Sequence, residues 1–101
     1  MTLLFAIAYR STAARELEAA DIDRLLHDAR SFNAKYDVTG VLLQHGSRFF
    51  QYLEGDSKGV CAAYLRIEAS SMHTNIVKLV ESPIADREIA AWHMGFCEAP
   101  A

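Results

Sequence analysis

Gln51 carries a side-chain amide inside a run, residues 48–55, that otherwise has the pattern of a buried β-strand. Because side chains alternate across a strand, Gln51 shares one face with Phe49 and Leu53. A buried amide without hydrogen bonds costs about 1–3 kcal/mol, and its nitrogen can donate while its oxygen accepts. Gln51 is therefore either a core amide bonded to the backbone or a side chain that recognises a ligand through hydrogen bonds.

Further aromatic, polar and sulfur-containing side chains fall on predicted strands or at the ends of helices. Tyr9 lies on the first predicted strand, and Trp92 and Met94 lie on the last. Asn33 ends the first predicted helix, where it can serve as a C-cap, and His73 follows the second helix, where it can cap a loop or contact a ligand. Strands hold side chains rigidly, so the spacing of these residues favours a binding site at the sheet.

Motifs of common enzymes and metal sites are missing from the sequence. It has no glycine-rich phosphate loop, no H-E-x-x-H pair and no G-x-S-x-G elbow, and the histidines at positions 27, 45, 73 and 93 lack the spacing of metal ligands. A small hydrolase or phosphatase would need such a loop or an identifiable nucleophile. We therefore expect neither an enzyme nor a metal site.

Composition is that of one globular domain, residues 1–101, with 51% hydrophobic residues and a net charge of -3. This charge provides no basic surface for nucleic acid. Cys61 and Cys97 form no C-x-x-C motif and are interpreted as reduced thiols. The apolar run 3–8 is too short for a membrane span and follows no basic stretch. We expect a soluble, cytoplasmic protein that binds neither nucleic acid nor membrane.

Hydrophobic periodicity predicts seven elements. The predicted strands are 2–10, 38–45, 48–54, 75–82 and about 90–97, and the predicted helices are 18–33 and 56–70. His45-Gly46-Ser47 suits a hairpin link, and Pro83 is expected to begin a loop. The order β-α-β-β-α-β-β indicates an α+β fold: a ferredoxin-like sandwich, with two helices on one face of a mixed five-stranded sheet.

The other face of that sheet is predicted to lack a helix. The apolar side chains expected there are Leu4, Ala6, Ala8, Val41, Leu43, Phe50 and Tyr52. A continuous apolar surface of this kind exceeds what soluble monomers usually expose. We expect it to pair with another protein, preferably a second copy in a symmetric homodimer.

Several separated segments together resemble the BLUF domain, a flavin-binding sensor of blue light. They are Tyr9-Arg10-Ser11, Asn33 followed by residues 38–43, Phe49-Phe50-Gln51-Tyr52-Leu53-Glu54-Gly55, His73-Thr74-Asn75 and Trp92-His93-Met94. The similarity runs from about residue 3 to residue 96. It implies a non-covalently bound flavin, normally FAD, with its ring between the two helices above the sheet. It also implies a downstream partner protein in trans, because we expect no output domain on this chain.

The same resemblance implies a role for each site residue. Tyr9 would donate an electron and a proton, Gln51 would switch its hydrogen bonds, Met94 would signal into the last strand, and Trp92 would be a competing electron donor. The implied cofactor-binding residues are Tyr9, Leu25, Ala29, Phe32, Asn33, Phe49, Gln51 and His73.

Two positions depart from the family pattern. Met72 replaces an arginine that could meet the flavin phosphate, so FMN and riboflavin are also possible ligands, and Phe32 replaces a polar residue. The alternative interpretation is a ferredoxin-like module that binds a small ligand or another subunit without photochemistry. The colour of the purified protein separates the two, because bound flavin is yellow.

Overall fold

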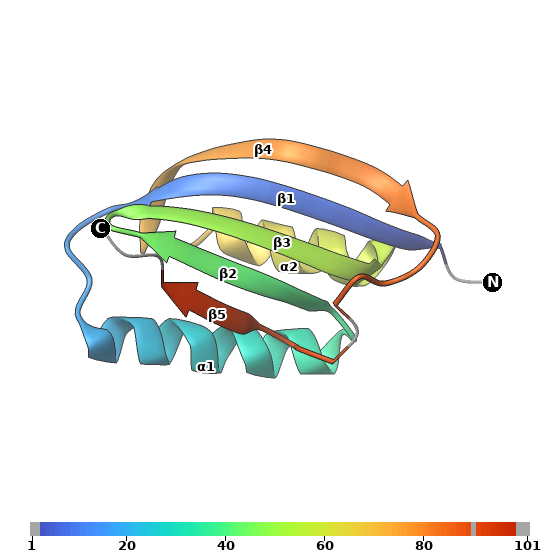
Figure 1. The fold of residues 1–101 in the computed structure, drawn as a ribbon, viewed down its shortest axis with the longest axis horizontal. Helices are drawn as coiled ribbons and strands as arrows, with labels where there is room; N and C mark the ends of the chain where they lie inside the picture. The colour runs from blue at the N-terminus through green and yellow to red at the C-terminus, as the bar shows by residue number, and fades with distance from the viewer. Residues whose placement is uncertain (1–2, 90, 99–101) are drawn as a thin grey trace.

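The computed structural model describes residues 3–89 and 91–98, and it confirms the predicted order of elements (Figure 1). The strands are β1 (Leu4–Ala13), β2 (Thr39–His45), β3 (Arg48–Asp56), β4 (His73–Ile84) and β5 (Gly95–Glu98), and the helices are α1 (Ala19–Lys35) and α2 (Ser57–Glu68). None of the described helices has the length and apolar character to cross a membrane. The described residues also contain no cluster of three or more candidate metal ligands.

The sheet has the order β4-β1-β3-β2-β5, with β4 and β5 at opposite edges (Figure 1). Neighbouring strands are antiparallel except β2 and β5, which are parallel. The register places Tyr9 of β1 directly opposite Gln51 of β3. These two residues therefore face each other near the middle of the sheet, on its helix-covered side.

Each helix packs on the sheet through the apolar stripe that the sequence predicts. The buried residues of α1 include Ile22, Leu26 and Ala29, and those of α2 include Val60, Ala63, Tyr64 and Ile67. At the start of α1, the Asp21 carboxylate accepts a hydrogen bond from the Glu18 backbone N–H, and the Asp56 carboxylate accepts one from the Lys58 N–H at the start of α2. Local capping and apolar periodicity thus agree on both helices.

Several predicted boundaries are wrong in detail. Asn33 does not cap α1, because the helix continues to Lys35 and Asp37 adopts the left-handed conformation after it, with φ 55°. Pro83 lies inside β4, which extends to Ile84, and an edge strand tolerates this proline because one side needs no ladder hydrogen bonds. Trp92 and Met94 both precede β5 instead of lying on the last strand.

A long connection links β4 at one edge of the sheet to β5 at the other, and a buried carboxylate holds it. Glu54 of β3 is 0% exposed. Its oxygens accept hydrogen bonds from the backbone N–H groups of Glu88 and Ile89 and from the Tyr52 hydroxyl. Arg87 of the same connection donates to the Asp37 carbonyl at 2.8 Å. These contacts direct the chain back toward α1 and β2 before it reaches Met94.

The helix-free face of the sheet is apolar, although not every predicted residue is exposed on it. Leu43, Phe50, Val77 and Val80 are exposed, whereas Ala6 and Ala8 are buried. The exposed apolar surface therefore lies mainly over β2, β3 and β4.

Candidate functional site

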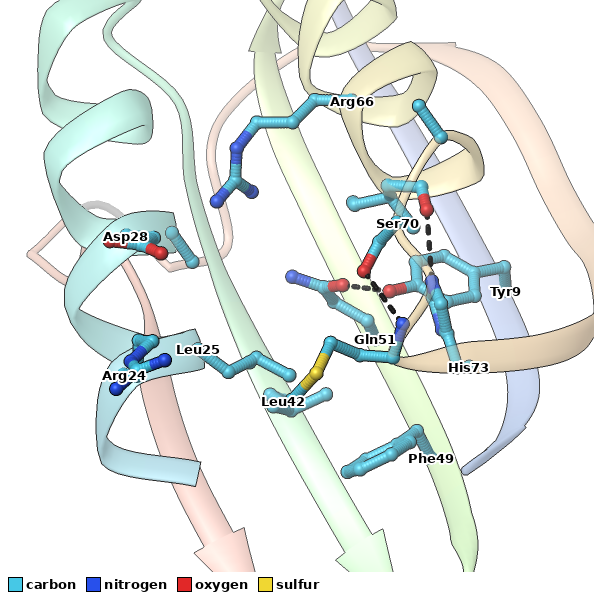
Figure 2. A pocket seen from close by; sticks show the side chains of 14 residues that line it. Tyr9, Arg24, Leu25, Asp28, Leu42, Phe49, Gln51, Arg66, Ser70 and His73 are labelled. Atoms are coloured by element: carbon cyan, nitrogen blue, oxygen red, sulfur yellow. Dashed lines mark hydrogen bonds between the residues drawn. The ribbon is translucent and has the colours of Figure 1, made fainter. Parts of the chain in front are cut away.

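A cavity of about 360 Å³ opens between the two helices, above the centre of the sheet (Figure 2). Its lining residues come from β1, β2, β3, both helices and the segment that follows α2. They are Tyr9, Arg24, Leu25, Asp28, Ala29, Leu42, Phe49, Gln51, Arg66, Ile67, Ala69, Ser70, Met72 and His73. A volume of this size suits a small organic ligand.

The amide of Gln51, which lines this cavity, bonds to two other side chains. The Tyr9 hydroxyl donates to Gln51 Oε1, as Figure 2 shows, and Gln51 Nε2 donates to the sulfur of Met94 at 3.4 Å. All three residues are buried. Gln51 is therefore no backbone-bonded core amide, and its hydrogen bonds link β1, β3 and the segment before β5.

Burial raises the pKa of the Tyr9 phenol, and the charge of Tyr64 raises it further while the Arg66 guanidinium lowers it. The two tyrosine rings meet edge to face, with centroids 5.9 Å apart. The Tyr9 phenol is protonated at neutral pH at its ordinary pKa of 10.0, the upward shift favours the same form, and its hydroxyl donates a hydrogen bond to Gln51. Tyr9 thus combines a redox-active ring with a proton held at a defined acceptor.

His73 lines the cavity, but the protein uses both of its ring nitrogens. Nε2 lies 2.9 Å from the carbonyl oxygen of Ile67, which can only accept, so Nε2 carries a proton. Nδ1 lies 2.8 Å from Ser11 Oγ and accepts a hydrogen bond from that hydroxyl. His73 can therefore contact a ligand with its ring but has no nitrogen left to offer it.

Arg66 is the cavity residue of most chemical interest that the sequence did not indicate. Its guanidinium lies 5.3 Å from the centroid of the Phe32 ring, and the side chain reaches into the cavity from α2 (Figure 2). Arg24 and Asp28 reach the cavity from α1. Arg66 lies in the last turn of α2 and Ser70 follows the end of that helix, so their closeness in the sequence is the signal that could have placed them together.

Asn33, Phe32 and Trp92, which the sequence placed at the site, do not line the cavity. The Asn33 amide is buried and donates to the His93 carbonyl at 2.6 Å. The Phe32 ring packs against Tyr36, with centroids 4.6 Å apart. Trp92 is 57% exposed and its ring packs on Gly95, outside the cavity.

The other predicted residues meet at the site. Leu25, Ala29 and Phe49 form apolar walls around Tyr9, Gln51 and His73, and Met94, which is not part of the lining, joins them through its contact with Gln51. Donors and acceptors lie close to apolar side chains, so the cavity suits a ligand that offers both apolar surface and polar atoms. The ring of a flavin has this chemistry, with carbonyl oxygens that Arg66 and the Gln51 amide could bind.

A family model described as sensors of blue-light using FAD matches residues 4–95. The chain belongs to the BLUF family. This BLUF domain is 37% identical over 78 residues to the blue light- and temperature-regulated antirepressor BluF of Escherichia coli, covering 77% of this chain and 19% of that protein. It is 33% identical over 86 residues to photoactivated adenylate cyclase subunit beta of Euglena gracilis, covering 85% of this chain and 10% of that protein.

The fold of this BLUF domain also matches a solved family member. The dark-state structure of the BLUF protein BlrB superimposes with a TM-score of 0.92 at 28% sequence identity, covering 97% of this chain and 74% of that chain. The domain is therefore a flavin-binding sensor of blue light, and a BLUF domain is a sensor module with no catalysis of its own. The family match therefore favours the light sensor over the alternative interpretation, a ferredoxin-like module that binds a small ligand or another subunit without photochemistry.

Proposed function

We propose that Tyr9 and Gln51 are the photoactive pair of this domain and that the cavity holds FAD, the flavin in the family's description. The hydrogen bond between these two cavity-lining side chains is the observation that carries the proposal. When bound, the flavin supplies a strong oxidant on absorbing blue light. Tyr9 would transiently give an electron and its hydroxyl proton to the excited flavin and would regain both when the charges recombine, so that only the hydrogen bonds of Gln51 stay rearranged until the dark state returns.

This electron and proton transfer leaves the Gln51 amide rotated, so that its oxygen and nitrogen exchange positions. In the dark arrangement its oxygen accepts from Tyr9 and its nitrogen donates to Met94. After a half-turn of the amide, the nitrogen faces Tyr9 and the oxygen faces the Met94 sulfur. Because oxygen cannot donate to sulfur, the Met94 side chain loses its donor. The light signal therefore leaves the cavity through Met94.

The apolar walls of the cavity and the Arg66 guanidinium would make most of the contacts with the flavin. Leu25, Ala29 and Phe49 supply contact area, while the guanidinium can donate to carbonyl oxygens of the ring. FMN and riboflavin carry the same ring as FAD, so we expect both to bind. Met72 lines the cavity where an arginine could have met a phosphate, and this limits discrimination among the three flavins.

The exposed helix-free face is the proposed site of self-association. Leu43 of β2 pairs with Phe50 of β3, Phe50 pairs with Arg10 of β1, and Arg10 pairs with Val77 of β4, so the row crosses four strands. A patch of this kind can bury itself symmetrically against a second copy. We also propose that output passes to another protein component and that the protein acts in the cytoplasm, where its two exposed free cysteines stay reduced.

The absorption spectrum of the flavin-bound protein, before and after blue illumination, tests the photoactive pair. Wild-type protein should be yellow and should show a reversible red shift. Gln51→Leu and Tyr9→Phe should each retain the flavin and lose the shift. Gln44→Leu is the matched control, because Gln44 is an amide on β2 outside the cavity whose Oε1 is buried without a partner among the described residues. A normal shift in either test variant at full flavin content removes that residue from the mechanism.

A further inference from the structure

The short segment that carries Trp92, His93 and Met94 is held by hydrogen bonds to α1 and to the residues at the start of β2. Gly40 N–H donates to the Trp92 carbonyl at 2.9 Å, and Asn33 Nδ2 donates to the His93 carbonyl at 2.6 Å. His93 Nδ1 donates to the Val38 carbonyl at 3.1 Å, and Arg30 Nε donates to the Met94 carbonyl at 2.9 Å. The segment is therefore a defined part of the fold.

Met94 is bound through its side chain and its backbone by different elements. Its sulfur accepts from Gln51 inside the core, while its carbonyl accepts from Arg30 of α1. Arg30 and Asn33 are three residues apart and so lie on the same side of the helix. Side-chain and backbone contacts of one residue thus connect the photoactive pair to α1.

We propose that Arg30 is a positioning residue that passes the displacement of Met94 to α1 and to the surface around Trp92. The inference rests on the proposed function of Gln51. An N–H···S contact is weak, whereas the bond from a guanidinium to a carbonyl is charge-assisted and stronger. When Gln51 releases the sulfur, the Arg30 bond persists, and Met94 moves together with the guanidinium.

The surroundings of Arg30 allow this movement. A hollow of about 530 Å³ lies beside it, lined by Arg30, Val41, Ala91, Trp92, His93, Met94, Gly95, Phe96 and Cys97. In the described part of the chain, Arg30 forms no ion pair with a carboxylate. The guanidinium is therefore anchored by Met94, and it borders open space in which it and the Trp92 ring can shift.

Trp92 makes the test direct, because it is the single tryptophan of the chain. Acrylamide quenching of its fluorescence is measured on flavin-bound protein in the dark and under blue light, together with the flavin red shift. Arg30→Met removes the donor at similar length, and Arg30→Lys restores a donor. Lys35→Met is the matched control, since Lys35 also lies on α1 and, among the described residues, its ammonium lies over the Tyr36 ring at 5.6 Å and forms no ion pair.

Wild-type protein and Lys35→Met should show a light-dependent change in Trp92 quenching. Arg30→Met should keep the red shift but lose more than half of the quenching change, and Arg30→Lys should recover it. A full quenching change in Arg30→Met overturns the inference, as does wild-type protein that has the red shift but no quenching change. Loss of the red shift in flavin-bound Arg30→Met also overturns it, because Arg30 would then act in the photochemistry. Wild-type protein without any red shift would instead refute the proposed function.

Discussion

Replacing Glu54 with glutamine should destabilise the domain, although the two side chains have nearly the same shape. Glu54 is completely buried, and its carboxylate accepts from the Ile89 N–H at one oxygen and from the Glu88 N–H and the Tyr52 hydroxyl at the other, both at 2.9 Å. An amide has one oxygen and one NH2 group. Whichever way the substituted amide turns, its NH2 group faces at least one donor.

The size of the effect follows from these contacts. Losing one hydrogen bond to a charged acceptor costs about 1.5–3 kcal/mol, and removing a buried charge relieves part of its desolvation penalty. We expect Glu54→Gln to lower the free energy of unfolding by roughly 1.5 kcal/mol, which corresponds to a fall in Tm of about 6–12 °C for a domain of this size. Tyr52→Phe removes one donor and should cost less, about 1 kcal/mol, because Tyr52 is half-buried and water can replace part of the lost hydrogen bond.

Urea unfolding of flavin-bound protein, followed by circular dichroism, measures this difference. Glu88→Gln is the control, because it changes the same functional group on an exposed side chain of the same connection; its effect should stay within about 0.5 kcal/mol. Equal stability of Glu54→Gln and Glu88→Gln would refute the idea that the buried carboxylate holds this connection in place.

Three further predictions concern the cofactor, the assembly and pH. Met72→Arg should tighten binding of FMN and FAD relative to riboflavin, and equal affinity changes in a titration would contradict a phosphate contact. Phe50→Lys combined with Leu43→Glu should shift the protein to monomers in sedimentation while flavin stays bound; wild-type protein that is monomeric at high concentration would exclude the dimer. Burial raises the Tyr9 pKa in the folded state above its ordinary value of 10.0. Tyr9 ionises more readily in the unfolded chain, so the free energy of unfolding should decrease as the pH rises above 10. Tyr9→Phe should reduce that fall in alkaline unfolding experiments.

Local sequence rules predicted the architecture well because the hydrophobic periodicity of each element is visible within its own residues. The two apolar stripes predicted both helices, and period-2 alternation placed Tyr9 and Gln51 on the helix-covered face. Boundaries were less accurate where tertiary contacts extend an element. β4 runs through Pro83 because β1 pairs with it along its full length, from Leu4 opposite Ile84 to Ala13 opposite His73.

Side chains that meet across long sequence separations could not be predicted in the same way. Trp92 and Met94 are two residues apart, so strand alternation assigns them to one face, yet Met94 is buried at Gln51 and Trp92 is exposed. Both residues lie before β5. In that segment, hydrogen bonds from Arg30 and Asn33 set the path of the chain, and no strand ladder imposes alternation.

The sequence by itself determined the order of the elements, the face of each strand and the presence of Gln51 among apolar neighbours, because these depend on periodicity within single segments. Tertiary structure alone decided that Arg66 enters the cavity, that Asn33 binds the His93 carbonyl and that Glu54 lies buried beneath the β4–β5 connection. Those outcomes depend on which polar groups become neighbours after folding. A buried polar atom needs a partner, but only the packed chain determines which partner lies within reach.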